Sequence, residues 1–130
     1  MNEIADVLRE IGWNAVVPAT TEMMKKTGNY DIAKVKTWHN NSKHFHIKRQ
    51  KADGHFGEVA KGDAILIVND DKFGMPNYIG PNATMEWGLA YYLGKPVFIL
   101  NGVPKDSNYY EEVYGISTAV LDGDLSKIKL

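Results

Sequence analysis

Cysteine is absent from this chain of 130 residues. Without a thiol the protein can form no disulfide, no cysteine nucleophile and no zinc site with cysteine ligands. Long apolar runs are missing as well, because no stretch approaches the roughly 18 residues that predict a membrane-spanning helix. The first residues also lack the cationic and then apolar pattern of a secretory leader. We therefore expect a cytoplasmic protein with no membrane anchor.

An excess of either charge is also absent. Fifteen Lys and Arg stand against sixteen Asp and Glu, so the net charge is −1 and no overall field attracts the chain to nucleic acid. A basic run does occur at residues 43–51, but without net basic charge a solvated helix face explains it better. His44 and His46 point to different sides of a helix, a spacing that disfavours a shared metal ion. We expect neither a nucleic-acid partner nor a metal site.

Several motifs of well-known chemistry are missing too. The chain contains no G-x-G-x-x-G, G-x-x-x-x-G-K-[ST], H-E-x-x-H or G-x-S-x-G. The dinucleotide, P-loop, zincin and α/β-hydrolase interpretations therefore lose their main sequence support.

What the chain does contain is an alternation of helical and strand patterns. Helices are expected at residues 4–11, 43–61, 80–94 and 105–114, and strands at 13–18, 64–68, 96–100 and 117–121. This alternation predicts one α/β domain over residues 1–130, with a doubly wound, flavodoxin- or Rossmann-like parallel sheet of four to five strands. The usual first strand of such a sheet has no counterpart, because the pattern begins with a helix. Either the strand order is unusual or a neighbouring chain fills the gap, so we expect a homo-oligomer, a dimer or higher.

A polar segment at residues 19–42 has no sustained periodicity. A loop of this length inside a small domain is often a functional lid. Its aromatic residues Tyr30 and Trp38 could cover a ligand, although a small hydrophobic cluster beneath the loop is the commoner use of such side chains.

Residues 62–101 predict a strand, a polar loop, a helix and a second strand. A βαβ unit of this kind places ligands beyond the carboxyl ends of its strands, here at the loop 69–82 and the first turn of the helix. Glu86 stands beside Trp87 on that helix, so we expect its carboxylate in partly apolar surroundings, which suggests a function. Alternatively, Glu86 faces water or complements the helix dipole.

Two further carboxylates, Asp70 and Asp71, end the first buried strand on the same side as Glu86. One carboxylate that orients or protonates a leaving base, with another that attacks a sugar carbon, can cleave a glycosidic bond. A solvated turn at Asp70 and Asp71 is the alternative interpretation.

These residues carry a resemblance to a known family. The runs DAILIVNDD at 63–71 and YIGPNATMEWGLAYYLGKPVFIL at 78–100 resemble the nucleoside 2-deoxyribosyltransferase superfamily, especially its small archaeal and bacterial members of unassigned activity. The family's helix has the form E-x-G-x-A-x-x-x-G-K-P. This chain matches it with Glu86, Gly88, Ala90, Gly94, Lys95 and Pro96. A weaker similarity extends to residues 4–18.

The resemblance implies a role for several residues. Glu86 would be the nucleophile that forms a glycosyl ester, and Asp70 or Asp71 would contact the base. The substrate-binding loop would also include Asn69, Gly80 and Asn82, with Asn82 near the sugar. Gly80, Pro81 and Asn82 stand where the family usually has an Asp. Gly88 is expected to let the helix approach the sheet closely.

The expected function is cleavage or transfer at the N-glycosidic bond of a (deoxy)nucleoside or its 5′-monophosphate, through a glutamate nucleophile. No cofactor is expected, since covalent glycosyl catalysis by a carboxylate needs none. Two alternatives remain. One is a catalytically inactive nucleotide-binding module of the same fold, and the other is a structural domain in which Glu86 merely belongs to a helix start.

Overall fold

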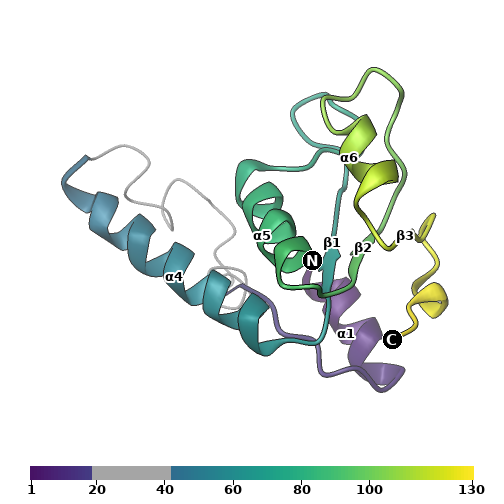
Figure 1. The fold of residues 1–130 in the computed structure, drawn as a ribbon, viewed down its shortest axis with the longest axis horizontal. Helices are drawn as coiled ribbons and strands as arrows, with labels where there is room; N and C mark the ends of the chain where they lie inside the picture. Colours follow the sequence, from purple (N-terminus) through teal and green to yellow (C-terminus); the bar gives the residue numbers. More distant parts are fainter. Residues whose placement is uncertain (19–41) are drawn as a thin grey trace. The chain divides into compact units, whose positions relative to one another are not determined.

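The structure is a computed structural model that describes residues 1–18 and 42–130 (Figure 1). The chain divides into two compact units, Met1–His55 and Phe56–Leu130, which are considered separately. Whether residues 1–130 act as a single domain stays a prediction. The expected lid at 19–42, with Tyr30 and Trp38, lies outside the described residues except for Ser42.

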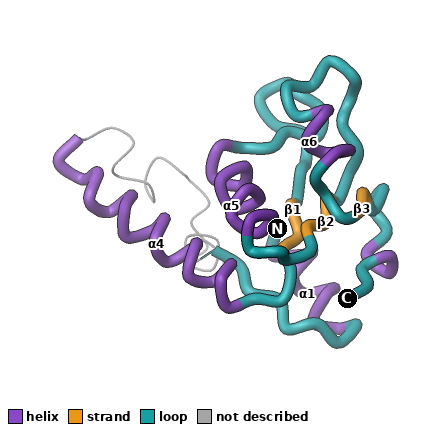
Figure 2. The backbone as a smooth tube through the Cα atoms, in the orientation of Figure 1, coloured by secondary structure: helices purple, strands orange, loops and turns teal. Residues whose placement is uncertain are grey.

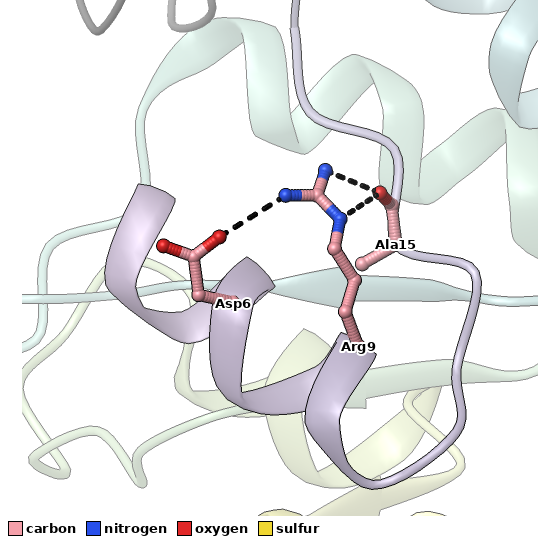
Figure 3. Close-up of polar contacts among 3 residues, drawn as sticks. All are labelled: Asp6, Arg9 and Ala15. Carbon is pink, nitrogen blue, oxygen red and sulfur yellow. Dashed lines mark hydrogen bonds and ion pairs between the residues drawn. The ribbon is translucent and has the colours of Figure 1, made fainter.

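The first unit begins with helix α1, Asn2–Glu10, which confirms the helix expected at 4–11. Its Ala5 and Leu8 are buried. Arg9 joins the helix to the segment that follows: its Nε and Nη2 donate to the carbonyl oxygen of Ala15 at 3.1 and 2.7 Å, and its Nη1 donates to Asp6 at 3.2 Å (Figure 3).

The strand predicted at 13–18 is wrong, because these residues have no regular secondary structure. The contact of Arg9 supplies a physical reason. The carbonyl of Ala15 accepts from the Arg9 guanidinium, and this side-chain contact stands where a strand would make ladder bonds to a neighbour. Apolar, β-branched composition alone therefore did not suffice to make a strand here.

A long helix follows the undescribed segment. The 3-10 turn η2, Ser42–His44, leads into helix α4, Phe45–Lys61, which confirms the helix expected at 43–61. The division between the two units falls inside α4, at residue 55. Val59, near its end, is buried in the core of the second unit.

The second unit contains a three-stranded parallel sheet (Figure 2). Its strands are β1 (Ile65–Ile67), β2 (Val97–Ile99) and β3 (Ala119–Val120), in the order β1-β2-β3. Ile65 pairs with Val97, and Phe98 pairs with Ala119. The α/β class and the parallel pairing are confirmed, and the architecture is compatible with a Rossmann-like fold. Among the described residues the sheet has three strands and not the four to five expected.

Two helices connect these strands. Helix α5, Pro81–Tyr92, joins β1 to β2, and the shorter α6, Tyr110–Gly115, joins β2 to β3. A final 3-10 turn, η3, spans Leu125–Lys127. The helix expected at 105–114 begins later, because the backbone after Pro104 makes successive turns through Ser107 before α6 starts.

Helix α5 begins and ends where the sequence indicates. Gly80 is its N-cap and Pro81 its first residue, where a missing N–H costs no helical hydrogen bond. It ends at Tyr92 with Leu93 as its C-cap, and Gly94 follows in the left-handed region with φ 72°. Gly88 is exposed, and a Cβ there would meet no atom of the described residues within 4 Å. The expectation that Gly88 allows a close approach to the sheet is therefore wrong.

The core of the second unit lies between the sheet and its helices. Every residue of β2 is buried, as expected for the central strand of a parallel sheet. Trp87 and Ala90 of α5 and Val113 of α6 pack into the same cluster. In the described part of the chain no helix is long and apolar enough to cross a membrane.

Candidate functional site

The candidate site begins at the carboxyl ends of β1 and β2, where two asparagines pair with one another. Asn69 lies two residues beyond β1, and Asn101 lies two residues beyond β2. The Asn69 amide donates to the Asn101 carbonyl at 2.6 Å, and its Oδ1 accepts from the Asn101 backbone N–H at 2.8 Å. The Asn101 side chain in turn donates to the Asn69 carbonyl at 3.2 Å. These bonds hold the two strand ends together after the regular ladder has stopped.

The loop between Asn69 and α5 is also tied to its surroundings. The Asp71 carboxylate accepts from the Asn77 N–H at 2.9 Å, and Tyr78 N–H donates to the Asp70 carbonyl at 3.0 Å. The Asn77 side chain donates to the Gly102 carbonyl at 2.6 Å, so it links this loop to the one that follows β2. Figure 1 shows both loops at the same end of the sheet. Several hydrogen bonds thus fix the edge at which an α/β sheet binds ligands.

Glu86 lies on the second turn of α5, the helix that follows this loop. It is half-buried, and the partly apolar surroundings expected for its carboxylate stay a prediction. Asn82 is also half-buried and stands one turn earlier, so Asn82 and Glu86 share a face of the helix. The first turn is fixed by Thr84, whose hydroxyl donates to the Gly80 carbonyl at 2.9 Å.

The predicted site residues differ in their exposure. Asp70 and Asp71 are exposed, and Gly80, like Asn82 and Glu86, is half-buried. Asn69 is fully buried, and its amide is engaged by Asn101. Its described contacts position the loop, and a direct substrate contact by Asn69 stays a prediction.

Sequence reasoning missed Asn77 and Asn101, which hold the loop. A signal for Asn101 exists, because it directly follows the apolar run 96–100 just as Asn69 follows the run 64–68. Asn77 has φ 51°, a left-handed conformation that Asn tolerates better than most residues. The residues around it in the sequence do not predict this conformation.

A shallow cavity of about 310 Å³ lies near the opposite, amino-terminal ends of β2 and β3. Lys95 and Thr118 line it, and both have internal partners. Lys95 Nζ donates to the carbonyls of Ala60, at 2.9 Å, and Gly62, while the Thr118 hydroxyl accepts from Val97 N–H at 2.9 Å. These contacts give the cavity's polar groups a structural role.

Within residues 1–18 and 42–130, no group of three or more His, Cys, Asp or Glu side chains could hold a metal ion. No family model, curated protein or solved structure matches this chain.

Proposed function

We propose that the protein cleaves, or transfers a group at, the N-glycosidic bond of a (deoxy)nucleoside or its 5′-monophosphate, with Glu86 as the nucleophile. The observation that carries the proposal is the position of Glu86: a half-buried residue on the second turn of α5, the helix that follows a hydrogen-bonded loop with Asp70 and Asp71 exposed to solvent. The match of residues 86–96 to the E-x-G-x-A-x-x-x-G-K-P pattern of the nucleoside 2-deoxyribosyltransferases supports it further.

The reaction proposed has two steps. In the first, a Glu86 oxygen attacks the anomeric carbon, the bond from that carbon to the base nitrogen breaks, and its electron pair leaves with the base. Asp70 or Asp71 contacts the base, which takes up a proton from water as it departs. In the second step water or another base attacks the same carbon and gives up a proton to solvent, and the bond from that carbon to the Glu86 oxygen breaks, which frees the carboxylate. Water makes the protein a hydrolase, and a second base makes it a transferase.

The proposal includes the surroundings of this site. The three strands belong to a sheet of four to five, completed by a further strand of the same fold or by a neighbouring chain. The assembly is then a homo-oligomer that acts in the cytoplasm on a small-molecule nucleoside or nucleotide.

Glu86→Gln tests the proposal because the amide keeps the shape of the side chain and removes its nucleophilicity. Parent and variant are incubated with a panel of deoxynucleosides and their monophosphates, with and without free bases, and the products are separated by chromatography. We expect base release by the parent, and a loss of about 10³-fold or more in the variant with its melting temperature nearly unchanged.

Glu111→Gln is the matched control, since Glu111 is an exposed glutamate on α6 and should leave turnover unchanged. A deoxyribosyl adduct on the peptide that contains Glu86, found by mass spectrometry, would support the covalent step. Full base release by the Glu86→Gln variant would refute the nucleophile. Binding of nucleosides by the parent without any turnover would instead favour an inactive nucleotide-binding module.

A further inference from the structure

A two-residue hairpin stands at the tip of the loop between β1 and α5. The backbones of Lys72 and Met75 bond to each other in both directions, N–H to carbonyl, at 3.1 and 2.8 Å. The two residues between them are both left-handed, with φ 53° at Phe73 and 71° at Gly74. These angles fit a type I′ turn, which normally carries Asn-Gly or Asp-Gly.

Phe73 is an unexpected residue at the first of these positions. A bulky side chain at positive φ is a true outlier, because its Cβ crowds the backbone. Burial does not offset the strain, since Phe73 is 79% exposed. Strained residues that persist in a well-anchored loop are commonly found at ligand sites.

The ring of Phe73 contacts the ring of Tyr78. Tyr78 meets it edge to face, with ring centroids 5.3 Å apart and an interplanar angle of 88°. The Tyr78 ring also lies over the start of α5, because its Cε1 is 3.7 Å from where a Cβ of Gly80 would stand. Two aromatic rings therefore run from the hairpin tip to the first turn of the helix that carries Glu86.

We propose that Phe73, braced by Tyr78, is the surface on which the base of the nucleoside stacks, and that this stacking selects purines over pyrimidines. The inference rests on the proposed function. A flat, exposed aromatic face suits a nucleobase, since every base offers a π-face to it. Asp70 and Asp71 precede the hairpin in the same loop, where carboxylates can accept from the N–H groups of a base. Phe73 has no polar atom, so it discriminates by stacking area, which is larger for a purine.

Phe73→Asn separates this role from a structural one, because Asn suits a type I′ turn better than Phe does. As a structural change it should raise the melting temperature by a few degrees. As the loss of a stacking partner it should weaken the binding of adenine and deoxyadenosine by about 5- to 100-fold, the range of one base–aromatic stack. Affinities are measured by calorimetry in the full chain, in the Glu86→Gln background so that turnover does not interfere.

Two further variants sharpen the result. Phe73→Trp keeps an aromatic face and should hold adenine affinity within a few fold of the parent. Met75→Asn is the matched control: Met75 is a large apolar residue of the same hairpin, 48% exposed and outside the left-handed region, and its substitution should leave affinity unchanged. Cytosine and deoxycytidine should bind more weakly than the purines to the parent, and this difference should shrink in Phe73→Asn.

The outcomes separate the two proposals. Purine binding that depends on Phe73, without base release by the parent, supports the stacking surface while the proposed chemistry fails. Base release by the parent with equal purine affinity in Phe73→Asn overturns the stacking surface and leaves the chemistry intact. No purine binding at all, or a fall in oligomer mass in Phe73→Asn with affinity unchanged, also overturns the stacking surface.

Discussion

Asn69 shows at the scale of one residue how a buried amide can shape a binding edge. Its donor and its acceptor both reach the backbone of Asn101, a residue 32 positions away. A side chain thus continues the pairing of β1 with β2 past the last strand residue, and the exposed Asp70 follows directly. The position of the candidate base-contacting carboxylates depends on a residue that does not itself reach solvent.

Asn69→Asp should therefore be costly although it changes only one atom of the side chain. The oxygen that replaces Nδ2 would face the Asn101 carbonyl, so two acceptors would meet in a buried place. We expect a loss of about 3 kcal/mol in the free energy of unfolding, measured by urea titration. The control is Asn108→Asp, at an exposed position, which should change it by less than about 0.5 kcal/mol. Equal free energies of unfolding for the two variants would show that the hydrogen bonds of Asn69 do not stabilise the fold.

Asp124 is a second residue whose hydrogen bonds should have a measurable effect, here on the pH dependence of stability. Its Oδ1 accepts from the Ser126 hydroxyl at 2.6 Å and from the Ser126 N–H at 3.0 Å, which caps η3. These bonds, the side-chain one first, lower the pKa of the Asp124 carboxyl below its ordinary value of 3.8. A lowered pKa in the folded state gives stability that is present above the unfolded value and is lost as the pH falls through the folded one.

We expect the parent to have a slightly higher melting temperature than Asp124→Asn at pH 7, because Asp124 is fully exposed and the effect is small. The difference should shrink as the pH is lowered below 3.8. Thermal unfolding followed by circular dichroism at several pH values measures it. Asp106→Asn is the control at another exposed aspartate, and a gap that stays constant with pH would contradict the capping role.

At the scale of the element, the two glycines of α5 should respond to alanine in opposite ways. Gly88 lies mid-helix and exposed, and no atom in the described part of the chain lies within 4 Å of a new Cβ, so Gly88→Ala adds helix propensity. Gly94 follows the helix at φ 72°, where a Cβ is strained. We expect Gly88→Ala to stabilise by about 0.5–1 kcal/mol and Gly94→Ala to destabilise by about 1 kcal/mol, in urea titrations. A loss of stability in Gly88→Ala would mean that a second copy of the chain packs closely against this face, which also carries Met85 and Tyr92.

The same helix shows what the sequence can predict. Its ends were predicted to within about two residues, because Gly80-Pro81 and Gly94 act locally through fixed φ and through positive φ. The strands at 64–68 and 96–100 were also predicted, since continuous apolar runs mark a buried parallel sheet. The failure at 13–18 depends on a side-chain contact from outside that segment. Arg9 donates to the carbonyl of Ala15, six residues away, and this contact cannot be seen in the composition of residues 13–18.

The candidate site was predictable to a similar degree. The βαβ pattern predicts that Asp70, Asp71 and Glu86 lie on the side of the sheet where the strands have their carboxyl ends, because all three follow β1 in the chain and precede β2. The fully buried state of Asn69 was not predictable, because it requires the register of β1 against β2 and the bend of the loop after it. The strained backbone of Phe73 was not predictable either, because it depends on the bend of the same loop.

At the scale of the whole molecule, the described sheet leaves two strands with one neighbour each. β2 is central, whereas β1 and β3 pair only with β2 among the described residues. Unpaired strand edges attract further strands and are usually covered. A sheet of four to five strands stays a prediction, and it would need further strands at the edge of β1 or of β3.

The last prediction concerns assembly. Helix α5 exposes Met85 and Tyr92, and Tyr92 is 86% exposed. The two residues are seven positions apart, about two turns, so both lie on one face of the helix. Large apolar side chains grouped in this way commonly mark a protein interface. We expect light scattering at micromolar concentration to give at least twice the chain mass of 14.6 kDa.

Tyr92→Glu tests whether this face of α5 makes the contact, because a carboxylate at a buried interface is strongly unfavourable. The variant should move the mass toward that of a single chain, with the circular dichroism spectrum unchanged. Tyr114→Glu is the control, since Tyr114 is an exposed tyrosine on α6 and its substitution should leave the mass as it was. A parent that already has the mass of one chain would contradict the assembly itself. If Tyr92→Glu leaves the oligomer intact, the interface lies on another surface, and the edges of β1 and β3 that are unpaired among the described residues are the next to test.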